Sequence, residues 1–147
     1  WESLYRGSPR VKSDQEVTQD DMARHHLILW GTPESNSLIR QLATSNGKPG
    51  SHPLPLEWSA RNVTIGAQKF PSAEHVPIMI YPNPLHPDHY VVFNSGPTHR
   101  EGHDRTNSLQ NPKLPDWAII NLAEPPTNLT PGRIVATGLF DESWQPR

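Results

Sequence analysis

Ser95 is the residue of this chain whose neighbours come nearest to a nucleophilic site. It follows an apolar segment and precedes Gly96, and His99 and Asp104 stand close by as a candidate base and orienting acid. A serine exposed on a strained strand-to-helix turn needs the pattern Gly-x-Ser-x-Gly, which occurs nowhere in the chain. We therefore interpret Ser95 as part of a tight turn at a strand end, and we predict no catalytic residue.

Two groups of histidines raise the question of a metal site. On a helix, His99 and His103 would lie one turn apart with Asp104 nearby, and His86 and His89 form a second, looser group. Neither group has an identifiable third ligand, and the chain contains no cysteine. We therefore predict that the chain holds neither a metal nor a cofactor.

The loop of residues 31–36 is the first of two loops with polar residues suited to binding. It lies between an apolar segment and a predicted helix start, where backbone N–H groups and the helix dipole favour an anion. Glu34 would repel a phosphate, and the pattern Gly-x-Gly-x-x-Gly is missing, so a carboxylate, a sugar hydroxyl or a partner backbone fits better. The alternative is an ordinary turn in which Ser35 or Ser37 caps the helix.

The second loop, residues 94–100, follows another apolar segment. In a parallel sheet, the loops after the carboxyl ends of the strands share one edge, and ligands bind there. If the two strands are neighbours, one cleft is lined by Thr32, Glu34, Asn36, Asn94, Thr98, His99 and Arg100. In this cleft Arg100 could pair with Glu34 or hold a substrate carboxylate.

Short apolar segments predict the strands that position these loops. The segment 26–30 is a continuous apolar run, typical of a strand buried on both faces. Further strands are predicted at 54–58, 63–65, 76–81, 90–93, 117–121 and 134–140. Thr18 and Asp21 form a helix start, and that helix should run to about residue 24. A second helix should carry Leu38, Ile39 and Leu42 on one face, and a third should cover about 100–110.

Strands that alternate with short helices favour an α/β fold with a layered sheet. We predict a small three-layer, flavodoxin-like or Rossmann-like domain with a mostly parallel sheet and a β-hairpin insertion around residues 54–66. Residues 1–14 are interpreted as an entry segment from an upstream domain, and residues 15–147 as one domain. Because the chain opens at Trp1 rather than Met, we expect its true start to lie upstream.

Composition excludes several classes of function. The chain has 147 residues, a net charge of −2 and no basic stripe, which excludes a nucleic-acid binder. No apolar run approaches the roughly 18 residues that cross a bilayer, so we predict no membrane span. The 17 prolines are typical of long, stiff loops around a modest core.

Five segments resemble a known family. In order along the chain they are 27–36 (LILWGTPESN), 75–84 (HVPIMIYPNP), 90–96 (YVVFNSG), 113–118 (KLPDWA) and 138–144 (GLFDESW). They resemble the C-terminal region of large bacterial secreted proteins of the prolyl-oligopeptidase-like serine peptidase and esterase family. The likeness covers most of residues 26–144. One departure is the stretch 97–104, which is rich in aromatic residues in the family but not here.

The resemblance implies an α/β-hydrolase domain upstream that carries the catalytic serine. This chain would then be a non-catalytic accessory module, secreted or periplasmic, that packs on that domain. Two other functions stay open, namely a module that binds an oligosaccharide or a carboxylate and a structural subunit that self-associates. Of the tryptophans, we expect Trp30, Trp58 and Trp117 to pack in the core and Trp144 to dock on a partner rather than to form sugar platforms.

Overall fold

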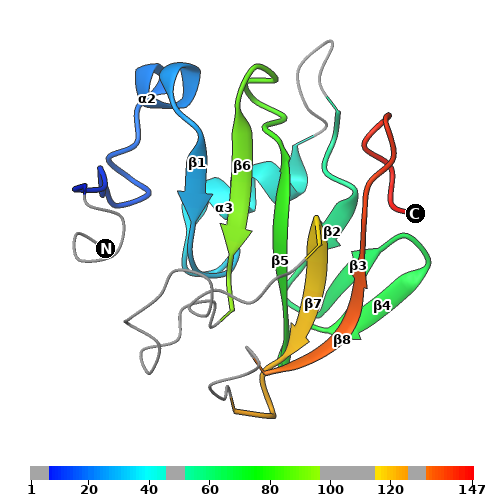
Figure 1. Ribbon diagram of the computed structural model, residues 1–147. Coiled ribbons are helices and arrows are strands. Elements are labelled where there is room, and N and C mark those ends of the chain that lie inside the picture. The colour runs from blue at the N-terminus through cyan, green and yellow to red at the C-terminus, as the bar shows by residue number, and fades with distance from the viewer. Residues whose placement is uncertain (1–6, 46–51, 97–114, 126–131) are drawn as a thin grey trace.

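Strands make up most of the computed structural model, which describes residues 7–45, 52–96, 115–125 and 132–147. In the described part the elements lie in two sheets with two short helices (Figure 1). In chain order they are α2 (Gln19–Arg24), β1 (Leu27–Leu29), α3 (Ser37–Thr44), β2 (Leu56–Trp58), β3 (Asn62–Ile65), β4 (Gln68–Pro71), β5 (His75–Pro82), β6 (Tyr90–Asn94), β7 (Trp117–Asn121) and β8 (Arg133–Gly138).

The larger sheet has five strands in the order β1-β6-β5-β7-β8. Among the described strand pairs of this sheet only β1 and β6 run parallel, whereas β6–β5, β5–β7 and β7–β8 are antiparallel. The predicted flavodoxin-like or Rossmann-like, three-layer fold with a mostly parallel sheet is therefore wrong. The reason is connection length: the loop 83–89 between β5 and β6 is too short for the crossover of a dozen or more residues that a parallel pair requires.

The smaller sheet contains the predicted hairpin and one strand more. β2 and β3 pair antiparallel, with Leu56 opposite Ile65 and Trp58 opposite Val63. The chain then turns at Gly66, whose φ of 56° lies in the left-handed region open to glycine, and returns as β4. β4 is polar and mostly exposed, so the apolar pattern on which the other strands were predicted was missing there.

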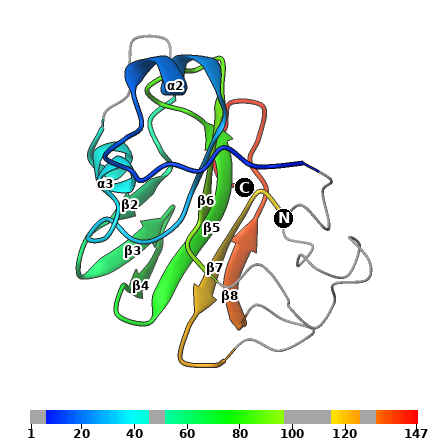
Figure 2. The same cartoon turned by 90° about the vertical axis from the view of Figure 1, so that its left-hand side faces the viewer.

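The core lies between the five-stranded sheet and a layer made of α3 and the three-stranded sheet (Figure 2). Leu27, Leu29, Val91 and Phe93 of β1 and β6 are buried, in alternation with residues of the opposite face. The second layer adds Leu38, Ile39 and Leu42 from α3 and Leu56, Trp58, Val63 and Ile65 from β2 and β3. The apolar face predicted for the second helix is confirmed.

The two described helices begin at side-chain caps. At α2 the Thr18 hydroxyl accepts from the Asp21 N–H at 3.1 Å and the Asp21 carboxylate accepts from the Thr18 N–H at 2.8 Å, so the predicted capping box is confirmed. Lys12 pairs with the same carboxylate at 2.7 Å. The bonds from Lys12 and Thr18 hold the pKa of Asp21 well below its usual range. Neither described helix is long and apolar enough to cross a membrane.

The predicted third helix, at about 100–110, falls outside the described residues. In the entry segment, residues 7–14 are described, and their last residue is bonded to the domain. The Asp14 carboxylate accepts from the Ser37 N–H at 2.7 Å, at the first turn of α3. Hydrogen bonding from the side chain and the N–H of Ser37 lowers the pKa of Asp14.

Candidate functional site

The two predicted binding loops begin at the same end of the sheet. β1 and β6 are parallel neighbours, with Leu29 opposite Phe93, and both arrows point the same way in Figure 1. The 31–36 loop and Asn94 therefore share an edge, as the predicted cleft required. Of the predicted cleft residues, the structure describes Thr32, Glu34, Asn36 and Asn94, whereas Thr98, His99 and Arg100 lie outside the described residues.

Polar groups of the 31–36 loop are bonded to the loop itself. The Thr32 N–H donates to the Ser35 hydroxyl at 2.9 Å. The Asn36 side-chain oxygen accepts from the N–H groups of Leu38 and Ile39 at 3.0 and 3.1 Å, and its amide nitrogen donates to the Trp30 carbonyl at 3.0 Å. Asn36 is thus the cap of α3, not Ser35 or Ser37. Because its side chain is used at both ends, Asn36 is not available to a ligand.

Glu34 borders a broad hollow of about 530 Å³ beside α3. Its lining residues are Pro33, Glu34, Arg40, Thr44, Trp58, Ser59 and Ala60. Arg40 donates to the carbonyls of Pro33 and Glu34 at 2.7 and 3.2 Å, which holds the loop against the helix. In this arrangement Arg40 stabilises the turn.

Ser95 is not placed as a nucleophile. Its hydroxyl is buried and has no hydrogen-bond partner in the part of the chain that the structure describes, whereas a serine nucleophile is activated by a base within hydrogen-bond reach. The imagined partners His99 and Asp104 lie outside the described residues. The interpretation of Ser95 as part of a turn at the end of β6 stays a prediction.

Several histidines of the described part have structural bonds. The His75 ring lies 2.9 Å from the Pro71 carbonyl and 3.2 Å from the Asn121 amide, and the residue is buried. His89 donates to the Ala23 carbonyl at 2.7 Å, which ties the loop before β6 to α2. Within the described ranges no three His, Asp or Glu side chains are grouped to hold a metal. The predicted pair His99 and His103 lies outside those ranges.

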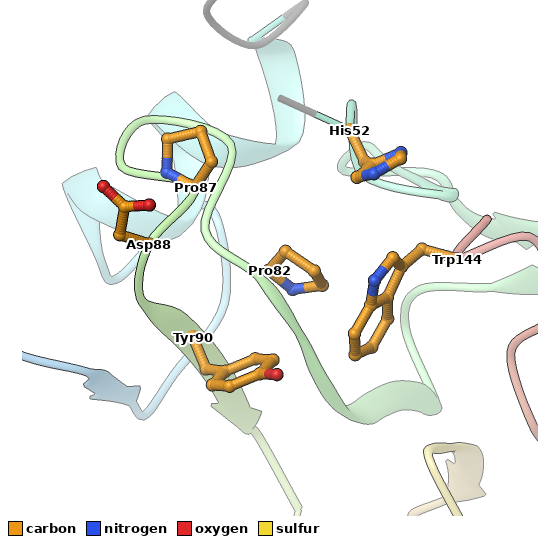
Figure 3. Close-up of a pocket in the computed structure, with 6 residues that line it drawn as sticks. All are labelled: His52, Pro82, Pro87, Asp88, Tyr90 and Trp144. Carbon is orange, nitrogen blue, oxygen red and sulfur yellow. The ribbon is translucent and has the colours of Figure 1, made fainter. Parts of the chain in front are cut away.

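A second hollow, of about 300 Å³, lies at the opposite end of the sheet, where β5 ends and β6 begins. Segments far apart in the sequence form it, and its lining residues are His52, Pro82, Pro87, Asp88, Tyr90 and Trp144 (Figure 3). Sequence reasoning missed this site because no local motif marks it. The one usable signal was Trp144, which we expected to dock on a partner.

Trp144 is held in place by the turn that contains it. The Asp141 side chain accepts from the N–H groups of Ser143 and Gln145 at 2.8 and 2.9 Å, and the Trp144 N–H donates to the Asp141 carbonyl at 3.0 Å. The bonds from Gln145 and Ser143 lower the pKa of Asp141. Trp144 itself has a φ of 60°, a left-handed conformation that is strained for a bulky side chain.

Tyr81 joins this turn to the core. Its hydroxyl lies 3.1 Å from the carbonyls of both Pro53 and Trp144 and can donate to either. Burial, with a smaller effect of the Asp141 charge, raises the pKa of Tyr81 to about 12, so the hydroxyl remains a donor at neutral pH. The Tyr81 ring also meets Phe140 and Trp144 edge-on, with centroids 5.2 and 5.6 Å apart.

No family model, curated protein or solved structure matches this chain. The resemblance to serine peptidases and esterases therefore remains a prediction, carried by the five segments alone.

The five-stranded sheet also exposes apolar residues on the face away from α3. Ile28 of β1 is 43% exposed, and Trp30, which continues the alternation, is 55% exposed. Ile80 is 40% exposed, and Val92, opposite both Ile28 and Ile80 in the register, is half-buried. We call these four residues the open face. The prediction that the 26–30 strand is buried on both faces and that Trp30 packs in the core is wrong, because the second layer covers one face only.

Proposed function

We propose that this chain is a non-catalytic accessory module that packs its open face on the catalytic domain of a secreted serine hydrolase. The observation that carries the proposal is the exposed apolar patch itself. Contiguous apolar patches on a protein surface mark sites of contact with other proteins. Ile28, Val92 and Ile80 lie side by side on three adjacent strands, and Trp30 directly follows β1.

The course of the N-terminal segment supports this partner. Residues 7–14 lie beside β1 in Figure 1, and in Figure 2 they cross that edge of the sheet toward the side opposite α3. A hydrolase domain that precedes this chain, as the resemblance implies, would therefore adjoin the open face. The buried Ser95 hydroxyl supports a module without a nucleophile of its own.

The first test compares hydrogen exchange in the parent protein and in the separate 147-residue chain. We expect the backbone around Ile28 and Ile80 to exchange more slowly in the parent, because packing of the open face would exclude water. The matched variants are Trp30→Ser on the open face and Leu122→Ser as a control, since Leu122 is 44% exposed but lies in the turn after β7. Trp30→Ser should abolish the extra protection, whereas Leu122→Ser should preserve it.

Three results would overturn the proposal. One is equal exchange of the open face in the parent and in the separate chain. Another is a dimer of the separate chain that Trp30→Ser dissociates, since the open face would then serve self-association. The third is turnover of a simple ester such as p-nitrophenyl acetate by the separate chain, which would contradict a non-catalytic module.

A further inference from the structure

We propose that the hollow between the Pro82–Tyr90 loop and the C-terminal turn binds a neutral sugar ring of an oligosaccharide. Six of the described residues line it, and two of these, Tyr90 and Trp144, carry benzene-type or indole rings (Figure 3). A volume of about 300 Å³ lies at the lower end of the range of small-molecule sites, roughly 300–1,000 Å³. The hollow lies at the opposite end of the sheet from the 31–36 loop, where the sequence predicted a ligand.

The first argument is the aromatic surface. The Tyr90 and Trp144 rings have centroids 5.9 Å apart and are inclined at 54°, so they adjoin at an angle and form an aromatic wall with two faces. Tyr90 is 41% exposed, and Trp144 is half-buried. One side of a pyranose ring presents C–H groups, and an aromatic face that is apolar across its body and polar at its tip suits such a ring.

The second argument is that polar groups in and beside that wall have no described hydrogen-bond partner. No described residue hydrogen-bonds to the exposed Asp88 carboxylate or to the Tyr90 hydroxyl. An ionised carboxylate has two oxygens that only accept, and it forms strong bonds with hydroxyl donors. Adjacent hydroxyls at the rim of a sugar ring are such donors. The half-buried His52 ring at the other side of the hollow offers a further polar contact.

The third argument is that the walls are fixed before any ligand arrives. Trp144 holds a strained φ of 60°, and such outliers persist only where the surrounding structure enforces them. The enforcing bonds are those of Asp141 to the turn and of Tyr81 to the Trp144 carbonyl. On the other wall, Pro82 and Pro87 have fixed φ angles, and the Asn83 N–H donates to the His89 carbonyl at 2.8 Å. Walls ordered in advance lower the entropic cost of binding.

Charge disfavours an anionic ligand, and a cation is the main competitor of a sugar. An anion would face the Asp88 carboxylate without a described Lys or Arg among the lining residues. A cation is best held over the face of an aromatic ring, within about 6 Å of its centre, and aromatic cages enclose it between several rings. Because Tyr90 and Trp144 lie against each other, they leave no room for a cation between them, and a cation held by one ring face is the competing ligand that the titration below tests. A neutral polyhydroxyl ligand satisfies both the wall and the carboxylate.

The test is a calorimetric titration of the purified chain with cellohexaose, chitohexaose and mannohexaose. We expect saturable binding of at least one of them, with quenching or enhancement of tryptophan fluorescence from Trp144. Asp88→Ala and Tyr90→Leu should each weaken that binding about tenfold or more. Both positions are exposed at the rim, so these variants avoid the loss of folding that Trp144→Ala could cause.

Glu34→Ala and Trp30→Ser serve as matched controls, because both change exposed residues away from the hollow and should leave sugar affinity unchanged. The inference is overturned if none of the three oligosaccharides binds at millimolar concentration, or if binding survives both Asp88→Ala and Tyr90→Leu. Preferred binding of tetramethylammonium or of a lysine-rich peptide would also overturn it. Trp30→Ser tests the proposed function and Asp88→Ala tests this inference, so either can fail alone.

Discussion

The two ends of the five-stranded sheet treat their polar side chains in opposite ways. At the end where β1 and β6 finish, the side chains of Asn36 and Asp14 accept hydrogen bonds from backbone N–H groups of α3. At the other end the backbone is clamped by Tyr81 and Asp141, while Asp88 and Tyr90 keep polar atoms without described partners. The first end also keeps an exposed carboxylate without a described partner, that of Glu34, so the contrast concerns the groups that cap α3 and those of Asp88 and Tyr90, which cap no helix.

The difference teaches that a polar residue type indicates a binding site only where its side chain is not already hydrogen-bonded within the protein. Asn, Ser and Asp before a helix can satisfy the orphan N–H groups of its first turn, and here they do so. A pattern of polar residues after a strand therefore indicates a capped helix as readily as a site. At the second end, buried groups such as the Tyr81 hydroxyl hold the backbone in place through hydrogen bonds. The exposed polar groups there remain available to a ligand.

The largest expected effect is at the clamped end. Tyr81→Phe removes the only described side-chain donor to the carbonyls of Pro53 and Trp144, so we expect a loss of about 1–3 kcal/mol in the free energy of unfolding. Tyr90→Phe removes a hydroxyl with no described partner and should cost less than about 0.5 kcal/mol. Urea denaturation followed by circular dichroism measures both. Equal losses of stability in the two variants would contradict the distinction between the Tyr81 hydroxyl, which holds the backbone, and the Tyr90 hydroxyl, which is available to a ligand.

At the capped end we expect a somewhat smaller effect. Asn36→Ala removes the acceptor for Leu38 and Ile39 and should cost about 1 kcal/mol, the usual cost of losing such a cap. Glu34→Ala, two positions before that cap and exposed, should change the free energy of unfolding by no more than about 0.5 kcal/mol. The same denaturation experiment applies. A larger loss for Glu34→Ala than for Asn36→Ala would contradict a cap at Asn36.

The smallest effect is an acid dependence shared by both ends. Asp14 and Asp141 have folded-state pKa values below the ordinary value of about 3.9, because Asp14 accepts hydrogen bonds from the side chain and the N–H of Ser37 and Asp141 accepts them from backbone N–H groups. Their contribution to stability is present above that pH and is lost as the pH falls through the folded pKa. Asp14→Asn and Asp141→Asn should each flatten the fall in thermal midpoint on acidification. An unchanged acid profile in either variant would show that its carboxylate is not stabilised there.

Much of the local structure could be predicted from the sequence. The apolar runs at 76–81, 90–93 and 117–121 are strands, and the capping pattern of Thr18 and Asp21 starts a helix. These features follow from neighbouring residues. Strand direction does not follow from neighbouring residues, because an apolar run has the same pattern in a parallel and an antiparallel sheet. The short 83–89 connection was the available clue to the antiparallel pairing of β5 and β6.

The candidate site was less accessible to sequence reasoning. Shared placement of the 31–36 loop and Asn94 was predicted as conditional on neighbouring strands, and that condition is met. The hollow at the other end was missed because its lining comes from His52, from the loop before Tyr90 and from Trp144, which meet only after both sheets are assembled. Residues that combine through tertiary packing leave no periodic or spaced signal.

The parallel pair of β1 and β6 has a consequence for how the molecule assembles. The antiparallel pairs β2–β3, β3–β4 and β5–β6 join segments that are close in the sequence, so each can form as a local unit. β1 instead must wait for β6, because Leu27 pairs with Val91 across the whole intervening chain. Contacts of such long range carry a high loop-closure cost and slow folding. We therefore expect β1 to pair with β6 late in folding, which completes that edge of the five-stranded sheet.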